Sequence, residues 1–126
     1  MSDIKKQIKY WSDGANSDLE TAVLLIKNKK YLHGLFFCHL TIEKILKAHV
    51  VKTTKEISPR THNLLWLSEK AKIELPRQEI EFMGILMKYQ LEGRYPDYMP
   101  YVPKAEKINE YLRNTKQLII WLKKRL

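Results

Sequence analysis

The segment Gly93-Arg94-Tyr95-Pro96-Asp97-Tyr98 gathers residues that could do chemistry. It opens a stretch, residues 93–103, that holds three prolines and three tyrosines. Proline lacks a backbone donor and forces the residue before it away from helical angles, so we expect a rigid, extended, non-helical loop. A rigid loop that presents Arg94 beside tyrosines suits recognition of a phosphate or a carboxylate. The alternative is a stiff spacer in which Arg94 pairs with Glu92 or Asp97.

A second group of charged residues lies in a segment that is otherwise apolar. Glu43 and Lys47 are one helical turn apart, in the order that favours an ion pair, and Lys44 lies beside them. On an exposed helix face such a pair contributes only about a few tenths of a kcal/mol. Because the surrounding residues are mostly apolar, these charges need partners in a groove or outside the helix, and Arg94 is a candidate. We therefore predict that Glu43, Lys47 and Arg94 form one polar cluster.

Other chemistries find little support in the sequence. His33 and His39 are six residues apart and His39 and His49 ten, so neither pair has the one-turn spacing of helical metal ligands. The four glycines are isolated, which excludes a glycine-rich phosphate loop. Cys38 lies in an apolar run. His39 follows it, but neighbouring residues on a helix do not face each other, so His39 is not placed to activate the thiol. We interpret Cys38 as a core residue. We expect no metal, no cofactor and no catalytic residue of these kinds.

Length and charge set the broad class. The chain of 126 residues fits a single domain, 1–126, with enough length to bury a core without disulfides. Its formal charge of +9 favours anionic partners, although lysines near helix ends also complement the helix dipole. The single cysteine, the absence of a long apolar run and the lack of a signal peptide's hydrophobic region lead us to expect a soluble, cytoplasmic protein with no membrane association.

Apolar residues recur at three- and four-residue steps, which predicts helices throughout. The first helix begins near Ile4 and stays in phase past Gly14, and the second, about 32–52, is apolar almost all round, as at the centre of a bundle or inside a dimer. A short third helix is expected after an N-cap at Thr61, a fourth from Pro76 to about Leu91, and a fifth after residue 103. The predicted fold is all-α, an antiparallel up-and-down bundle of about five helices.

Four segments together resemble the HEPN family, a name that stands for higher eukaryotes and prokaryotes nucleotide-binding. The Glu43-Lys44-Ile45-Leu46-Lys47-Ala48 run, preceded by small and aromatic residues, is similar to the family's second-helix signature. Trp11 with the Ala15-x-x-Asp18 spacing resembles its first helix, and Thr61-His62-Asn63-Leu64 resembles the start of its third. Arg94-Tyr95-Pro96-Asp97 is similar to the loop of small prokaryotic members.

The resemblance implies a symmetric homodimer that often pairs with a minimal nucleotidyltransferase encoded alongside, as in toxin–antitoxin systems. Many members are metal-independent ribonucleases that use an Arg and a His with four to six residues between them. Here the corresponding positions hold Met99, Pro100 and Tyr101. A toxin branch carries Arg-x4-His-x-Tyr, whose tyrosine the partner enzyme adenylylates, and Tyr101 takes that place here.

The leading hypothesis is thus a non-catalytic, dimeric binding module that docks a nucleotidyltransferase and holds a nucleotide or an RNA phosphate. The residues expected to bind are Arg94, Glu43, Lys47, Lys44, Tyr95 and Asp97, and Tyr101 is a candidate for modification. The alternatives are a ribonuclease whose base is displaced to His39 or His62, and a purely structural dimer.

Overall fold

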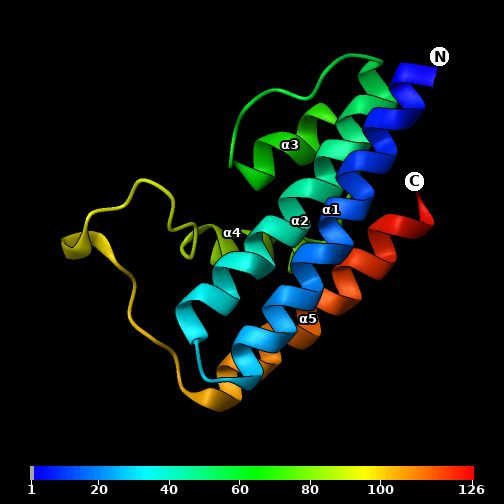
Figure 1. Ribbon diagram of the computed structural model, residues 1–126. Helices are drawn as coiled ribbons and strands as arrows, with labels where there is room; N and C mark the ends of the chain where they lie inside the picture. Colours follow the sequence, from blue (N-terminus) through cyan, green and yellow to red (C-terminus); the bar gives the residue numbers. More distant parts are fainter. Residues whose placement is uncertain (1) are drawn as a thin grey trace.

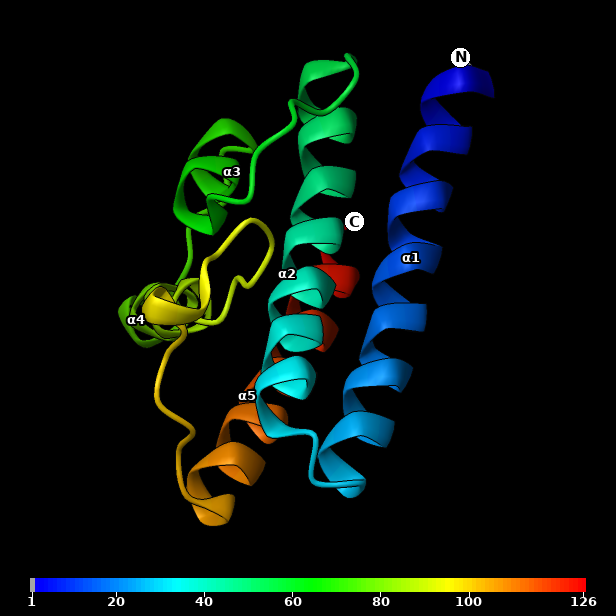
Figure 2. The same ribbon diagram turned by 60° about the vertical axis from the view of Figure 1, so that its left-hand side comes forward.

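The computed structural model describes residues 2–126, which form an all-α bundle without β-strands. Two long helices run antiparallel, the C-terminal helix lies beside them, and two short helices pack on the other side (Figures 1 and 2). The elements in chain order are α1 (Ser2–Lys27), α2 (Tyr31–Thr54), α3 (Leu64–Lys70), α4 (Arg77–Met87), a one-turn 3-10 helix (Pro96–Tyr98) and α5 (Ala105–Lys124). Within residues 2–126, no helix combines the length and the apolar character needed to cross a membrane.

Helix α2 is the centre of the bundle, as its apolar composition predicted. It packs against each of the other four α-helices. Such a helix is stable only when apolar surface is removed from water on every side, and α2 buries its residues around most of its circumference. Its buried apolar residues include Leu35, Cys38, Ile42, Ile45, Leu46, Ala48, Val50 and Val51. The continuous first helix is also confirmed, since α1 runs through Gly14 without a break.

The starts and ends of the short helices differ from the prediction. Helix α3 is capped by Asn63, whose side-chain oxygen accepts a hydrogen bond from the Trp66 amide at 3.0 Å. Thr61 was the wrong cap, because its hydroxyl accepts the Asn63 amide at 3.2 Å and so forms the turn before the helix. Helix α4 ends at Met87 instead of about Leu91, because its last amides bond three residues back and tighten the final turn.

Helix α4 buries one apolar face against the bundle. Phe82, Met83 and Leu86 are buried, whereas Ile80 is largely exposed. Tyr89, just beyond the helix, continues the buried face and lies beside the Tyr111 ring of α5. Helix α4 and the residues just after it therefore pack against α5 through Phe82 and Tyr89, whose rings lie beside Tyr111.

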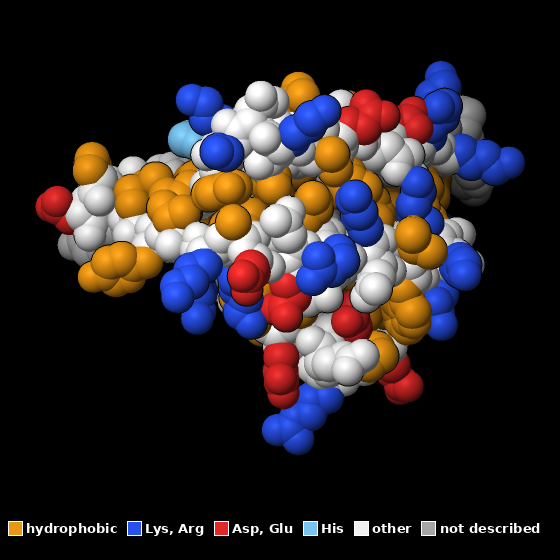
Figure 3. All heavy atoms as spheres, turned by 90° about the horizontal axis from the view of Figure 1, so that it is seen from below, with side chains coloured by type: hydrophobic (Ala, Val, Ile, Leu, Met, Phe, Trp, Pro, Cys, Tyr) orange, Lys and Arg blue, Asp and Glu red, His pale blue; other side chains and the backbone are white. Residues whose placement is uncertain are grey.

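Residues 92–103, here called the arm, project to one side of the bundle (Figure 1). The prediction of an entirely non-helical loop was wrong in one respect, since Pro96 begins a single 3-10 turn, where its fixed φ is favourable. Tyr95, Met99, Tyr101 and Val102 are exposed, Tyr101 at 97%. In Figure 3, hydrophobic side chains cover much of the projecting part of the molecule.

The α1–α2 turn brings the two helices into close contact at Gly34. A Cβ atom added there would lie 2.5 Å from Cγ1 of Ile26, closer than any real packing contact. Gly84 of α4 offers a comparison, because a Cβ at that position would meet nothing within 4 Å. A methyl group should therefore be costly at Gly34 and harmless at Gly84.

We predict that Gly34→Ala lowers the free energy of unfolding by about 1–3 kcal/mol, the typical cost of overpacking a tight contact. The control Gly84→Ala, inside α4, should instead raise it by up to about 1 kcal/mol, because alanine favours a helix more than glycine does. Urea unfolding followed by circular dichroism measures both. Equal effects of the two substitutions would contradict the close approach of α1 and α2.

Candidate functional site

The candidate site begins with a buried ion pair on α2. The Nζ atom of Lys47 donates to Oε2 of Glu43 at 2.9 Å, and the two side chains are only 8% and 4% exposed. Removing two charges from water costs more than their attraction returns unless further hydrogen bonds satisfy them. The pairing predicted from the one-turn spacing is confirmed, and its burial raises the question of what else satisfies Glu43.

Helix α1 contributes an aromatic ring to this pair. The Lys47 ammonium lies 5.0 Å from the centroid of the Trp11 ring, within the range of a cation–π interaction. Lys47 is thus held from both sides, by a carboxylate and by an aromatic face. Within the monomer, both Lys47 and Glu43 serve to position neighbouring groups, because little of either side chain reaches the surface.

His39, one turn before Glu43, is a buried neutral imidazole. Its Nε2–H donates to the main-chain oxygen of His62 at 3.1 Å. Burial lowers the pKa of His39 to about 4, although the nearby Glu43 carboxylate acts in the opposite direction. With Nε2 carrying the proton, Nδ1 is a bare acceptor, and it lies 3.6 Å from Oε1 of Glu43. Oε1 must therefore take its hydrogen bond from another residue.

That residue is His62, which precedes α3. Its Nδ1–H donates to Oε1 of Glu43 at 2.9 Å, while the side chain remains 45% exposed. The opposite ring nitrogen, Nε2, lies 3.4 Å from Oε2 of Glu92 at the base of the arm. A buried carboxylate that binds one nitrogen of an imidazole fixes its orientation and, when the ring is neutral, leaves the other nitrogen as an acceptor or base.

The arm reaches the cluster through Glu92. Arg94 follows two residues later, is exposed, and places Nη2 3.5 Å from the main-chain oxygen of Met87. Tyr95 and Asp97 are also exposed on the arm. The structure brings Glu43, Lys47, His62 and Glu92 together by direct contacts, and the inclusion of Arg94 in this cluster stays a prediction.

Lys44 points to a different neighbour. Its ammonium forms an ion pair with Asp18 of α1 at 2.8 Å, with the two side chains 28% and 11% exposed. Lys44 therefore ties α2 to α1 beside the site. Sequence spacing alone could not separate its role from that of Lys47, since both residues follow Glu43 closely.

The structure also bears on thiol and metal chemistry. Burial raises the pKa of the Cys38 thiol to about 11, outweighing a hydrogen bond with Thr115, so the reactive thiolate is disfavoured at neutral pH. Among residues 2–126, no three His, Cys, Asp or Glu side chains are grouped in a way that could hold a metal ion.

The family model for the HEPN domain matches residues 8–126. The chain belongs to the HEPN family. Two solved structures share its fold at 20% sequence identity. TT1696 from Thermus thermophilus aligns with a TM-score of 0.79, covering 95% of this chain and 98% of that one. ST0689, an archaeal HEPN homologue, aligns with a TM-score of 0.67, covering 94% and 96%. No curated protein matches the sequence significantly.

The cluster brings together residues from HEPN-like segments that are far apart in the sequence. Trp11 comes from the first segment, Glu43 and Lys47 from the second, and His62 from the third. Each contacts another member directly, so three separated segments meet around one buried carboxylate. His62 was expected only as an alternative base. Its position before a helix and next to Asn63 carries no signal that it contacts Glu43, because that contact depends on how loop 55–63 folds back on α2.

We predict that acid destabilises this HEPN domain through His39. Because its folded pKa of about 4 lies below the unfolded value near 6.5, the unfolded state binds more protons between these values. The contribution of His39 to the free energy of unfolding should be fully present above about pH 6.5. It should fall by up to about 3 kcal/mol as the pH approaches 4. Urea unfolding at several pH values should show this slope flattened in His39→Gln and retained in the control His33→Gln, whose histidine is exposed. An unchanged slope in His39→Gln would contradict the assignment.

Proposed function

We propose that this HEPN domain is a binding module that holds a phosphate group of a nucleotide or of RNA beside His62 and the arm. The observation that carries the proposal is the partly exposed His62 ring, fixed by the buried Glu43 and next to Glu92. Glu92 begins the segment that presents Arg94, so two residues suited to anions lie on adjoining segments. The guanidinium of Arg94 donates to phosphate oxygens, and Nε2 of His62 donates to them when the ring carries a second proton.

Glu92 must give way for a phosphate to reach the His62 ring. Its side chain is 65% exposed and its contact with Nε2 is long, at 3.4 Å. Exposed ion pairs of this kind contribute about 0–1 kcal/mol, so an anionic phosphate group can replace the carboxylate. The formal charge of +9 increases the rate at which anionic ligands approach. In this proposal the phosphate takes the place of the Glu92 carboxylate beside His62.

A second candidate function is metal-independent cleavage of RNA with His62 as the base. The Glu43–His62 hydrogen bond favours it, because a carboxylate that orients an imidazole is the arrangement a general base needs. Two features favour binding alone. Glu92 already contacts the nitrogen that would accept the ribose proton, and the three family positions after Arg94 hold Met99, Pro100 and Tyr101. Methionine and proline accept no proton, and tyrosine is a weak base near neutral pH.

Assembly completes the proposal. The exposed apolar side chains of the arm suit burial in a homodimer, in which each copy's arm meets the other copy. A minimal nucleotidyltransferase is the proposed protein partner, and Tyr101, fully accessible on the arm, is the tyrosine it would modify. In such a dimer, the arm of the second copy would lie near the ligand site of the first. Dimerisation would therefore also set the shape of that site.

We predict that Arg94→Ala weakens binding of labelled single-stranded RNA and of AMP by about tenfold, the effect of one lost charge-assisted contact. Arg77→Ala removes the same charge from an exposed position on α4 and should change affinity about twofold or less. Fluorescence anisotropy measures affinity at fixed salt, and the Tm of both variants should stay near that of the wild type. In EDTA, RNA should remain intact.

Equal losses in Arg94→Ala and Arg77→Ala would mean that only net charge matters and would contradict a site on the arm. Cleavage in EDTA that disappears in His62→Gln would establish the ribonuclease function. A lower Tm in Arg94→Ala, with unchanged binding per folded molecule, would show that Arg94 stabilises the fold and does not bind the ligand.

We predict a dimer mass by light scattering at micromolar concentration. Tyr95→Ser combined with Tyr101→Ser should shift the equilibrium toward the monomer, because these side chains would lose buried apolar area. The control is Tyr10→Ser, which removes an exposed tyrosine from α1. A wild-type protein that stays monomeric, or a dimer equally sensitive to Tyr10→Ser, would argue against the arm as the interface.

A further inference from the structure

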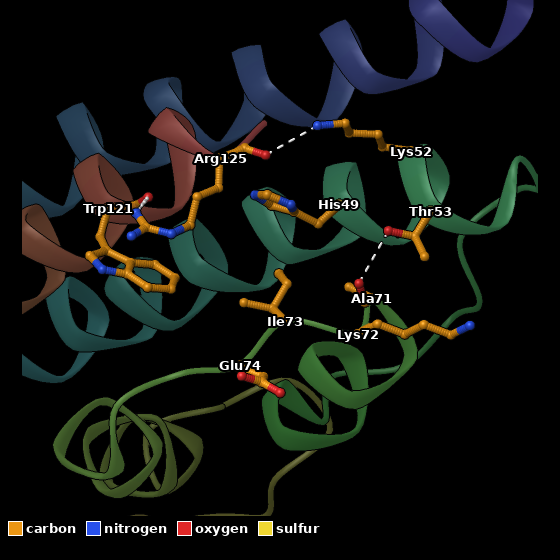
Figure 4. Close-up of a pocket in the computed structure, with 9 residues that line it drawn as sticks. All are labelled: His49, Lys52, Thr53, Ala71, Lys72, Ile73, Glu74, Trp121 and Arg125. Carbon is orange, nitrogen blue, oxygen red and sulfur yellow. Dashed lines mark hydrogen bonds between the residues drawn. The ribbon is translucent and has the colours of Figure 1, made fainter.

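We infer that a hollow between α2, α5 and the α3–α4 connection is a second binding site, for a small aromatic anion such as a ring that carries a phosphate. The hollow has a volume of about 290 Å³. Figure 4 shows the residues around it, with His49 on α2, Trp121 on α5, Arg125 directly after α5, and Lys72 and Glu74 on the connection. This inference does not depend on the phosphate site beside His62.

The two sites use opposite faces of α2. Successive residues on a helix are about 100° apart, so Lys47 lies close to Glu43 around the axis. His49 and Lys52 fall on the other side, about 240° and 180° from Glu43 by the same arithmetic. A ligand in the hollow would therefore touch none of the Glu43, Lys47 and His62 cluster.

The planar guanidinium group of Arg125 offers a surface on which an aromatic ring of the ligand would stack. The guanidinium carbon of Arg125 is 3.4 Å from the centroid of the Trp121 ring, and Nη1 donates to the Trp121 main-chain oxygen at 2.9 Å. These contacts hold the guanidinium against the face of the indole. A guanidinium held in this way can stack on a second planar group, and Ile73 adds an apolar side chain to the wall.

The charges of the lining favour an anion. Lys52, Lys72 and Arg125 contribute three positive charges and Glu74 one negative charge, a balance of +2. The ammonium of Lys52 donates to the main-chain oxygens of Arg125 and Leu126 at 3.1 and 2.7 Å. An ammonium has three donors, so one remains for a ligand oxygen. Lysine and arginine at a helix end also complement its dipole, but that role needs neither a hollow nor a stacked indole.

His49 adds an acceptor to the same lining. Its Nε2–H donates to the main-chain oxygen of Leu122 at 2.8 Å. Burial lowers the pKa of His49, more than that hydrogen bond raises it, so the ring is neutral near pH 7 and Nδ1 is an acceptor. Together with the Glu74 carboxylate, it suits a ring that carries an amino group. A volume of about 290 Å³ is at the lower end of ligand sites, which limits the occupant to roughly the size of a mononucleotide.

The test is a titration of the full chain, labelled with ¹⁵N, followed through the indole N–H signals of its three tryptophans. Trp121 reports the hollow, and Trp11 reports the cluster beside His62. AMP and phenyl phosphate should both shift the Trp121 signal, and inorganic phosphate should shift it far less. A short oligoadenylate that binds more tightly than AMP would identify an RNA residue as the occupant, and the reverse a free nucleotide.

Substitutions test whether the charged residues that line the hollow bind AMP. Arg125→Gln combined with Lys72→Gln should lower AMP affinity at Trp121 by at least about tenfold, because two charge-assisted contacts are lost. The matched control is Arg113→Gln with Lys70→Gln, which removes the same charge from exposed positions outside the hollow. A static Trp121 signal with AMP, equal shifts with inorganic phosphate, or equal losses in the two double variants would overturn the inference. A shift of Trp11 alone would support the site beside His62 and overturn this one.

Discussion

The burial of one carboxylate, that of Glu43, constrains more of this molecule than any other single interaction. An uncompensated charge in the centre of the bundle would cost several kcal/mol, so each Glu43 oxygen must be satisfied by another part of the chain. Lys47 supplies one partner from the same helix, and His62 supplies the other from the loop before α3. Meeting this requirement ties α2 to that loop, and the stacking of Lys47 on Trp11 extends the network to α1. A local electrostatic requirement thereby organises three segments of the sequence.

The central place of α2 also explains why chemistry-capable groups lie on two faces of the same helix. Because α2 is surrounded by other helices, every polar group on it must be satisfied by a neighbouring element or must line a space between elements. His39 and His49 both do so through Nε2–H bonds to main-chain oxygens, of His62 and Leu122. Each imidazole thus fastens a different element to α2. The arm is the contrasting case, since its apolar side chains remain exposed in the monomer.

Much of the fold could be predicted because helical periodicity is a local signal. The apolar circumference of α2 required a central position. On α5, Ile108, Leu112 and Leu122 recur at helical spacing and are buried. Errors occurred where two local signals competed. Thr61 and Asn63 are both good capping residues, and only the path of the chain into α3 decides for Asn63. At α4, apolar residues continue past Met87, yet the last turn tightens so that Tyr89 can pack on Tyr111.

The sequence by itself determined the all-α class, the pairing of Glu43 with Lys47 and the proline-rich character of the arm, because each depends on residues within about one or two helical turns. Only the tertiary structure decided that His62 binds Glu43, that Lys44 binds Asp18 instead, and that Trp121 and Arg125 border a hollow with His49. These contacts join residues far apart in the chain. Their geometry follows from how whole helices pack, and a packing angle is set by the sum of many side-chain contacts that no short segment contains.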